Sequence, residues 1–152
     1  MSIRENLCLT AYMGKLKICL GFVKRAEARK IAQTQHDKLK VKSAGLEQKI
    51  SSLSGGNQQK GMICRWLAND VKLLVLNMPT RGVDVGARAE IYRALEDLVE
   101  QGVAVLTISP EMPEVLSIAD TVVVMHEGRI TGKLTRENAT QEELMKLALE
   151  IA

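Results

Sequence analysis

Two hydrophobic patterns divide the chain. Up to about residue 68 the apolar residues recur at helical spacing, and from Leu73 onward short apolar runs alternate with helical stretches. The second arrangement is typical of a parallel α/β sheet. The sequence therefore predicts an α/β fold: a helical region followed by a mostly parallel sheet with flanking helices.

Three helices are expected in the first region. Ser2 and Glu5 have the spacing of a capping box, in which each side chain accepts an N–H at a helix start, so a helix begins at Ile3. Two further helices are predicted over residues 25–40 and about 57–68. Their apolar faces are formed by Ala28, Ile31 and Ala32 in the second helix and by Met62, Ile63, Trp66 and Leu67 in the third.

The second region predicts a βαβ unit and a hairpin. Residues 73–76 are expected as a buried strand, and residues 103–108 as the strand after the next helix. Residues 121–126 and 129–134 are expected to pair through a turn at Glu127 and Gly128. The remaining features are the helical stripe Ile91, Leu95 and Leu98, the helix end at Gly102, and a last amphipathic helix capped by Thr140 and Glu143.

The composition fits one globular domain. The 152 residues are 46% hydrophobic and 26% charged, which is enough for a core. No apolar run approaches the ~20 residues that span a bilayer. Lys15 and Lys17 interrupt the one stretch that resembles a signal peptide, so a cytoplasmic protein is expected. The cysteines are odd in number and form no C-x-x-C pair, which predicts buried thiols and neither a disulfide framework nor a zinc site: Cys8, Cys19 and Cys64.

Charge is unevenly distributed along the chain. Residues 1–60 contain 12 Lys and Arg against 4 Asp and Glu, whereas residues 61–152 contain 9 against 14. A basic half can bind nucleic acid or anionic lipid. The interleaved aromatic residues that stack on single-stranded bases are missing, however. The basic side chains therefore indicate a solvated helical surface, and no nucleic-acid partner is expected.

One short segment suits anion binding. Residues 53–60 read LSGGNQQK and place a hydroxyl and two glycines just before a predicted helix. Glycines let the backbone approach a ligand closely, and the N–H groups and dipole of a helix start favour negative charge. An ordinary Ser/Gly helix cap has the same features, so this segment alone leaves both interpretations open.

Together with its neighbours, the segment resembles the nucleotide-binding domain of ABC transporters. Residues 53–60 look like the ABC signature, residues 73–78 occupy the place of Walker B, and residues 82–84 that of the D-loop. More narrowly, the chain is similar to the C-terminal part of the second nucleotide-binding domain of carbohydrate importer ATPases of the ribose/galactose/xylose type. The motifs that carry this narrower resemblance are NQQK, PTRGVDVGA at 79–87, EMPEV at 111–115 and VMHEG at 124–128.

The resemblance implies that residues 1–152 form a single truncated nucleotide-binding domain with a partial P-loop NTPase fold. Residues 1–68 are its helical and signature region, and residues 69–152 its Walker B, D-loop and C-terminal α/β part. ABC domains pair head to tail, so the signature is expected to contact ATP held by a partner nucleotide-binding domain. The implied nucleotide-contacting residues are Leu53, Ser54, Gly55, Gly56, Asn57, Gln58 and Asp84.

Other parts of the family's site depart from its pattern. The Walker A motif G-x-x-x-x-G-K-[ST], which holds phosphates, does not occur in this sequence. Walker B normally ends in Asp-Glu, which hold Mg²⁺ and polarise water, but Asn77 and Met78 stand there. An amide brings no charge and a thioether accepts no proton. The chain alone is therefore expected to hold no cofactor and to lack ATPase activity, whereas ATP and Mg²⁺ serve the assembled family complex.

Further expected catalytic groups are also missing. The family's histidine after the next strand is replaced by Ser109 and Pro110, and His36 and His126 are expected to be structural or solvent-facing. If the first strands of the domain are absent, an open sheet edge and an uncovered apolar face are expected.

The resulting hypothesis is an ATP-binding fragment of a sugar ABC importer that supplies its signature in trans. It also docks a sugar permease through residues 1–50, at the inner face of the cell membrane. The alternative is a non-catalytic remnant or interaction module that keeps the ABC fold and binds no nucleotide. An ABC ATPase of DNA repair fits less well, because the motifs at 80–82 and 112–114 match the sugar class.

Overall fold

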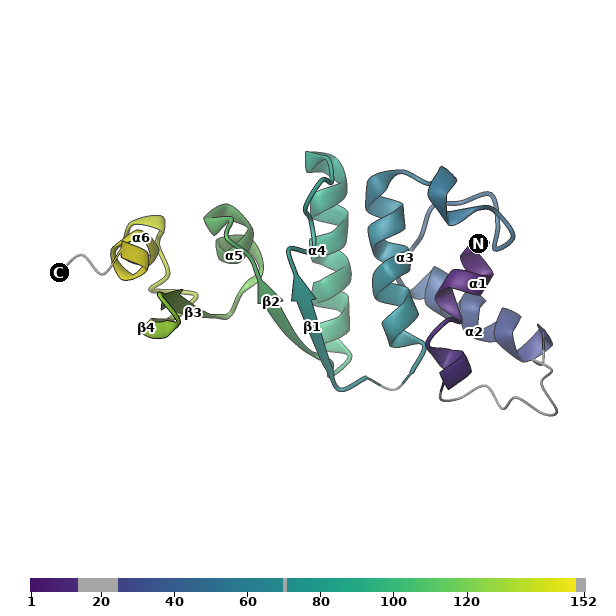
Figure 1. Ribbon diagram of the computed structural model, residues 1–152, viewed down its shortest axis with the longest axis horizontal. Helices are drawn as coiled ribbons and strands as arrows, with labels where there is room; N and C mark the ends of the chain where they lie inside the picture. The colour runs from purple at the N-terminus through teal and green to yellow at the C-terminus, as the bar shows by residue number, and fades with distance from the viewer. Residues whose placement is uncertain (14–24, 70, 150–152) are drawn as a thin grey trace. The chain divides into compact units, whose positions relative to one another are not determined.

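The computed structural model describes residues 1–13, 25–69 and 71–149 (Figure 1). It divides into two units: Met1–Leu74 with Thr80–Val105, and Val75–Pro79 with Leu106–Ala152. Each unit packs around its own buried side chains. Among the described residues, none of the helices combines the length and apolarity needed to span a membrane.

Helix α1 (Ile3–Leu7) opens the first unit as predicted. The Ser2 hydroxyl accepts the Glu5 N–H at 3.2 Å, and the Glu5 carboxylate accepts the Ser2 N–H at 2.8 Å, which completes the capping box. Ile3 and Leu7 are fully buried, and the helix packs against α2 and α3. A 3-10 helix, Ala11–Met13, follows.

Helix α2 (Arg25–Lys38) ends two residues before the predicted boundary. Lys40 has a φ of 49°, a left-handed conformation that cannot continue a right-handed helix. Ala28 and Ala32 are fully buried as predicted, whereas Ile31 is only partly buried.

The described cysteines are buried thiols, as predicted. Cys8 Sγ donates to the Ala28 carbonyl at 3.0 Å, and Cys64 Sγ donates to the Gln35 carbonyl at 3.2 Å. Burial raises the pKa of Cys64 to about 12, so its thiol stays protonated. Cys19 lies outside the described residues.

Helix α3 (Gly55–Leu67) follows a second 3-10 helix, Ile50–Ser52, and begins two residues earlier than predicted. In Figure 1 it lies between α4 and the pair formed by α1 and α2, and it contacts all three. The predicted apolar face is wrong in part, because Met62 and Trp66 are 41% and 53% exposed. The buried face of the helix is rotated relative to the predicted face and includes a charged residue. It contains Lys60, Ile63, Cys64 and Leu67.

Strand β1 (Leu73–Asn77), helix α4 (Val85–Glu100) and strand β2 (Ala104–Ile108) form the predicted βαβ unit. The Ala104 N–H donates to the Lys72 carbonyl at 2.9 Å, and the Met78 N–H donates to the Ile108 carbonyl at 2.8 Å. The starts of the two strands therefore pair with each other, as do their ends, so the strands are parallel.

The prediction of a fully buried first strand is wrong. Leu74 and Leu76 are buried, but Leu73 and Val75 are 55% and 53% exposed. An apolar run shows that both faces of a strand are hydrophobic but does not show what covers each face. Within the second unit Val75, Leu106 and Ile108 are each about half exposed, so the expected uncovered apolar surface is present among the described residues.

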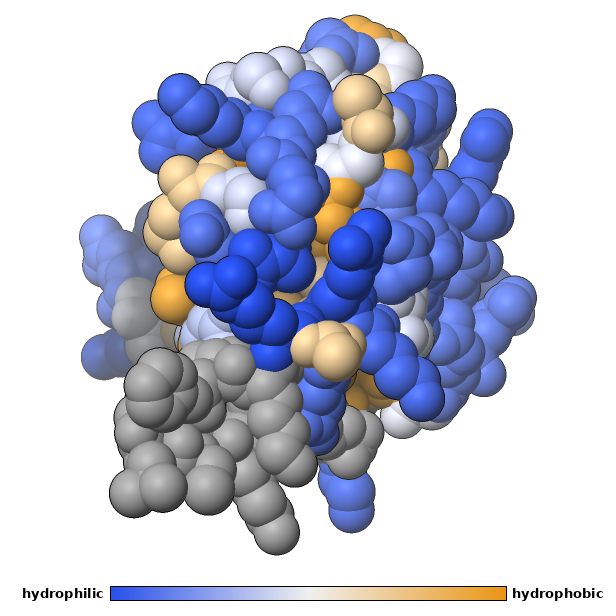
Figure 2. All heavy atoms as spheres, turned by 90° about the vertical axis from the view of Figure 1, so that its right-hand side faces the viewer, coloured by the Kyte–Doolittle hydropathy of each residue, from blue (hydrophilic) through white to orange (hydrophobic). Residues whose placement is uncertain are grey.

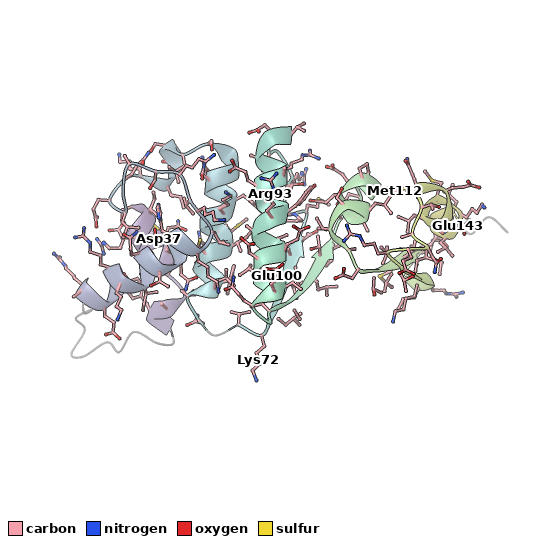
Figure 3. The ribbon with its side chains drawn as sticks, turned by 180° about the vertical axis from the view of Figure 1, so that it is seen from behind. Asp37, Lys72, Arg93, Glu100, Met112 and Glu143 are labelled. Atoms are coloured by element: carbon pink, nitrogen blue, oxygen red, sulfur yellow. The ribbon has the colours of Figure 1, made fainter. Side chains whose placement is uncertain are left out.

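Helix α4 matches its predicted pattern. Its apolar stripe, Ile91, Leu95 and Leu98, is buried. Arg93 and Glu100, labelled in Figure 3, are exposed on the same helix. The chain turns beyond the helix at Gly102, whose φ of 86° suits a residue without a Cβ.

The second unit contains helix α5 (Met112–Ile118), the hairpin of β3 (Thr121–His126) and β4 (Arg129–Thr135), and helix α6 (Gln141–Leu149). The strands pair antiparallel, and the turn residues Glu127 and Gly128 have φ values of 44° and 79°, as a primed hairpin turn requires. The Thr140 hydroxyl accepts the Glu143 N–H at 3.2 Å and caps α6 as predicted. The short helix α5 was not predicted from the sequence.

Candidate functional site

The predicted anion-binding segment forms an extended entry into α3. Leu53 is buried and anchors the entry, while Ser54 is the N-cap residue with φ −61° and ψ 155°. The Ser54 side chain makes no capping hydrogen bond, and both Ser54 and Gly55 are exposed. The first N–H groups of a helix have no intrahelical partner. The segment therefore presents a hydroxyl and backbone donors at the positive end of the helix dipole.

Two of the predicted contact residues, Asn57 and Gln58, use their side chains in hydrogen bonds within the protein. Asn57 Oδ1 accepts the Lys42 N–H at 2.7 Å, and Asn57 Nδ2 donates to Ser54 Oγ at 2.9 Å. Gln58 Nε2 donates to the Leu53 carbonyl at 2.8 Å. Both amides thus hold the shape of the segment.

Gly56 is required by a close contact between helices. It is buried, and a Cβ built on it lies 2.5 Å from the Ala87 Cβ of α4. At the neighbouring Gly55, a Cβ meets only the Gly82 carbonyl oxygen, at 3.7 Å. The start of α3 therefore lies directly against the segment that leads into α4.

Asp84 caps the helix that this segment opens. Its Oδ1 accepts the Ala87 N–H at 2.9 Å, and its side chain is exposed. The structure thus brings the signature-like residues Gly55 and Gly56 beside the D-loop-like residues Gly82 and Val83, a contact between segments that the sequence did not predict.

A buried lysine joins α3 to α4. The Lys60 side chain is only 5% exposed, and its Nζ donates to Glu90 Oε2 at 3.0 Å. Lys42 Nζ donates to the other carboxylate oxygen at 2.6 Å. These two hydrogen bonds lower the pKa of Glu90 to about 2. The group Lys42, Glu90 and Lys60 will be called the lysine–glutamate clamp.

No spacing in the sequence predicts that the three residues of the clamp come together. Its lysines lie 48 and 30 residues from Glu90, beyond any helical periodicity. Only the place of Lys60 in phase with Ile63 and Leu67 indicates a buried cation, and such a group needs a partner.

The clamp predicts a specific pH dependence. The folded-state pKa of Glu90 is depressed from 4.5 to about 2, so its stabilisation is present above the unfolded value and is lost as the pH falls from there toward 2. Thermal melts should show that wild type loses more stability than Glu90→Gln between about pH 6 and pH 3. Glu96→Gln, an exposed change on the same helix, should behave like wild type. Equal losses in wild type and Glu90→Gln contradict the prediction.

The end of β1 does not fit a magnesium site. Asn77 is exposed there, and Met78 has a φ of 49°. Neither side chain brings the carboxylate through which proteins usually bind Mg²⁺. Within residues 1–13, 25–69 and 71–149, no group of three or more His, Cys, Asp or Glu side chains is placed to hold a metal ion.

The histidine on α2 has local polar neighbours. His36 Nε2 lies 2.9 Å from Ser43 Oγ, and Nδ1 lies 3.1 Å from Asp37, which is labelled in Figure 3. His126 is paired with Arg129 in the hairpin. These positions agree with the expected structural or solvent-facing roles.

Comparison with solved structures defines the fold. The chain matches a predicted metal-chelate type ABC transporter in an inward-facing conformation with a TM-score of 0.83 and 20% identity, over 99% of this chain and 58% of that one. It matches the ATP-binding cassette MJ1267 of an ABC transporter with a TM-score of 0.80 and 23% identity, over 97% and 62%. The fold is that of an ABC ATPase cassette, and this chain contains part of it.

The sequence relatives of the chain are ATP-binding proteins of sugar import. The chain is 52% identical over 151 residues to a predicted ribose/galactose/methyl galactoside import ATP-binding protein of Pseudomonas fluorescens. It is 45% identical over 148 residues to the ribose import ATP-binding protein of Caldanaerobacter subterraneus. These matches cover 97% of this chain but only 28% and 30% of the relatives. No protein-family model matches the chain.

Along nearly its whole length the chain is similar to a segment of the ATP-binding proteins of sugar ABC importers, as the motifs indicated. It spans less than a third of the length of the curated relatives it matches.

Proposed function

We propose that this chain supplies a signature surface in trans to a partner nucleotide-binding domain of a sugar importer. The observation that carries the proposal is the start of α3, where Ser54 and Gly55 are exposed and the Ser54 hydroxyl makes no capping bond. The relatives named above are ATP-binding proteins, so the anion in this proposal is a phosphate group of ATP.

The arrangement suits a terminal phosphate. A hydroxyl and backbone N–H groups at a helix start donate to oxyanions, and the helix dipole adds to the attraction. In this proposal ATP and Mg²⁺ are held by the partner domain, and the metal neutralises the charge that develops on the phosphates. Ser54 and the first-turn N–H groups of this chain bind and orient the γ-phosphate.

The chain itself is proposed to hydrolyse no ATP. The sequence contains no Walker A motif, and Asn77 and Met78 occupy the places of the metal-binding and water-polarising carboxylates. Changing both residues to Asp and Glu does not restore activity in this proposal, because the phosphate cradle is still missing.

The test uses a separately purified cassette domain that carries a Walker A loop and whose own signature serine is replaced by arginine. Adding this chain should raise the rate of ATP hydrolysis by that domain. Ser54→Arg should abolish the increase, because a bulky side chain blocks the start of α3. Ser51→Arg, an exposed change three residues earlier, is the matched control and should keep it.

The outcomes separate the two hypotheses. An increase that survives Ser54→Arg means that mere association is responsible. No increase with a wild-type chain that melts cooperatively favours the remnant or interaction module. Gly56→Asp is unsuitable for this test, because any Cβ at Gly56 meets Ala87.

We propose that residues 1–50 dock a sugar permease, so that the chain works at the inner face of the membrane. Figure 2 shows that the face of the first unit on which α1 and α2 lie is dominated by hydrophilic side chains. Arg25, at the start of α2, is exposed there. Basic groups on such a surface suit acidic permease loops or an anionic leaflet.

Reversal of basic residues should weaken this docking. Changing Arg25 together with Lys15, Lys17 and Lys24, which lie outside the described residues, to Glu should reduce recovery of the permease in a pull-down. Unchanged recovery of the permease contradicts the docking proposal and means that these side chains only form a solvated surface. The matched control, which should leave recovery intact, reverses four exposed basic residues elsewhere: Lys72, Arg129, Lys133 and Arg136.

A further inference from the structure

The Ser54 hydroxyl is held by a hydrogen-bonded chain. The Lys42 N–H donates to Asn57 Oδ1 at 2.7 Å, and Asn57 Nδ2 donates to Ser54 Oγ at 2.9 Å. A backbone N–H can only donate, so the oxygen of the Asn57 amide faces Lys42 and its nitrogen faces Ser54.

These two hydrogen bonds limit what the Ser54 hydroxyl can do. Because Ser54 Oγ accepts from Asn57, its own O–H is directed toward a different acceptor. In the part of the chain that the structure describes, no acceptor is recorded for it, and Ser54 is exposed at the helix start. The Ser54 Oγ atom is therefore held by Asn57 from one side, while its O–H stays available to donate to an external group.

The support behind Asn57 is itself anchored. Val41, beside Lys42, is 4% exposed and belongs to the core. The Lys42 side chain enters the lysine–glutamate clamp through Glu90 at 2.6 Å, and Lys60 ties that carboxylate to α3. One residue, Lys42, thus holds Asn57 through its backbone and α4 through its side chain. Such a shell keeps a binding group in a fixed geometry.

We propose that Asn57 is a positioning residue that aims the Ser54 hydroxyl at a phosphate oxygen presented by the partner domain. This inference rests on the proposed function, and it differs from the expectation that Asn57 itself contacts the nucleotide. Asn57 acts through Ser54, and Lys42 acts through Asn57.

The first experiment tests the contact in the full chain without a partner. In an ¹⁵N-labelled chain, Ser54→Ala should shift the side-chain amide signals of Asn57, because their acceptor is lost. Ser51→Ala is the matched control and should leave them unchanged. If Ser54→Ala leaves the Asn57 signals unchanged, the inference is wrong, whatever the stimulation assay shows.

The second experiment tests the role, in the stimulation assay described above. Asn57→Ala should lower the stimulation about fivefold, the effect of one hydrogen bond. In a Ser54→Ala chain the same change should cost nothing further, because a residue that acts only through Ser54 is fully coupled to it. An equal loss in both backgrounds, with cooperative melts throughout, overturns the positioning role. Absence of stimulation by the wild-type chain, with the Asn57 shift present, instead marks failure of the proposed function.

Discussion

Gly56→Ala should lower the free energy of unfolding by about 1–3 kcal/mol, the usual cost of overpacking a tight contact. The new Cβ lies 2.5 Å from the Ala87 Cβ, and neither methyl group has a rotamer that relieves the overlap. The start of α3 must therefore move away from α4. Gly55→Ala is the matched control and should be neutral or slightly stabilising, because its Cβ meets only a carbonyl oxygen at 3.7 Å.

A second change identifies the cause of this loss. Ala87→Gly removes the opposing methyl group, so adding it to Gly56→Ala should recover stability, less the ~1 kcal/mol that glycine costs inside a helix. Urea unfolding of the wild-type chain and these three variants measures both effects. A Gly56→Ala chain as stable as Gly55→Ala refutes the close contact, and failure of Ala87→Gly to help places the strain elsewhere.

Ile91→Ala should destabilise the first unit by about 2–5 kcal/mol, through lost burial and the cavity left behind. Ile91 is fully buried in the stripe of α4 that it forms with Leu95 and Leu98. Val99→Ala on the same helix is the matched control. It is 47% exposed and should change stability by about 0.5 kcal/mol or less.

Urea unfolding also measures this pair of variants. Similar small effects at Ile91 and Val99 mean that α4 does not carry the core of the unit. A large effect at Val99 alone means that the buried face of α4 has been assigned incorrectly.

Local signals in the sequence predicted local structure well. The capping box at Ser2 and Glu5, the hairpin turn at Glu127 and Gly128 and the apolar stripe of α4 all formed as expected. Each depends on residues within about one or two turns of one another, whose geometry the backbone fixes.

Non-local packing set the features that the sequence did not predict. The buried face of α3 includes Lys60 because the carboxylate of Glu90, 30 residues away, neutralises its charge. Leu73 and Val75 were expected to be buried, but the apolar run in β1 holds no information on what covers its second face.

At the candidate site, too, the local features were predicted from the sequence and the non-local contacts were not. The motif located the Ser54 segment, and glycine at positions 55 and 56 indicated a close approach. Only the structure showed that Ala87 is what Gly56 approaches, and that Lys42 holds Asn57. These partners come from other helices and loops, so no spacing in the chain records them.

The most direct test of the trans signature is association that depends on ATP. Sedimentation velocity of this chain with a Walker-A-bearing cassette, made deficient in hydrolysis and with its own signature serine replaced, should show a 1:1 complex with ATP and free components without it. Ser54→Arg should prevent the complex, and Ser51→Arg should not. A complex that forms equally without ATP, or that survives Ser54→Arg, contradicts the claim that Ser54 and the start of α3 bind a nucleotide held by the partner.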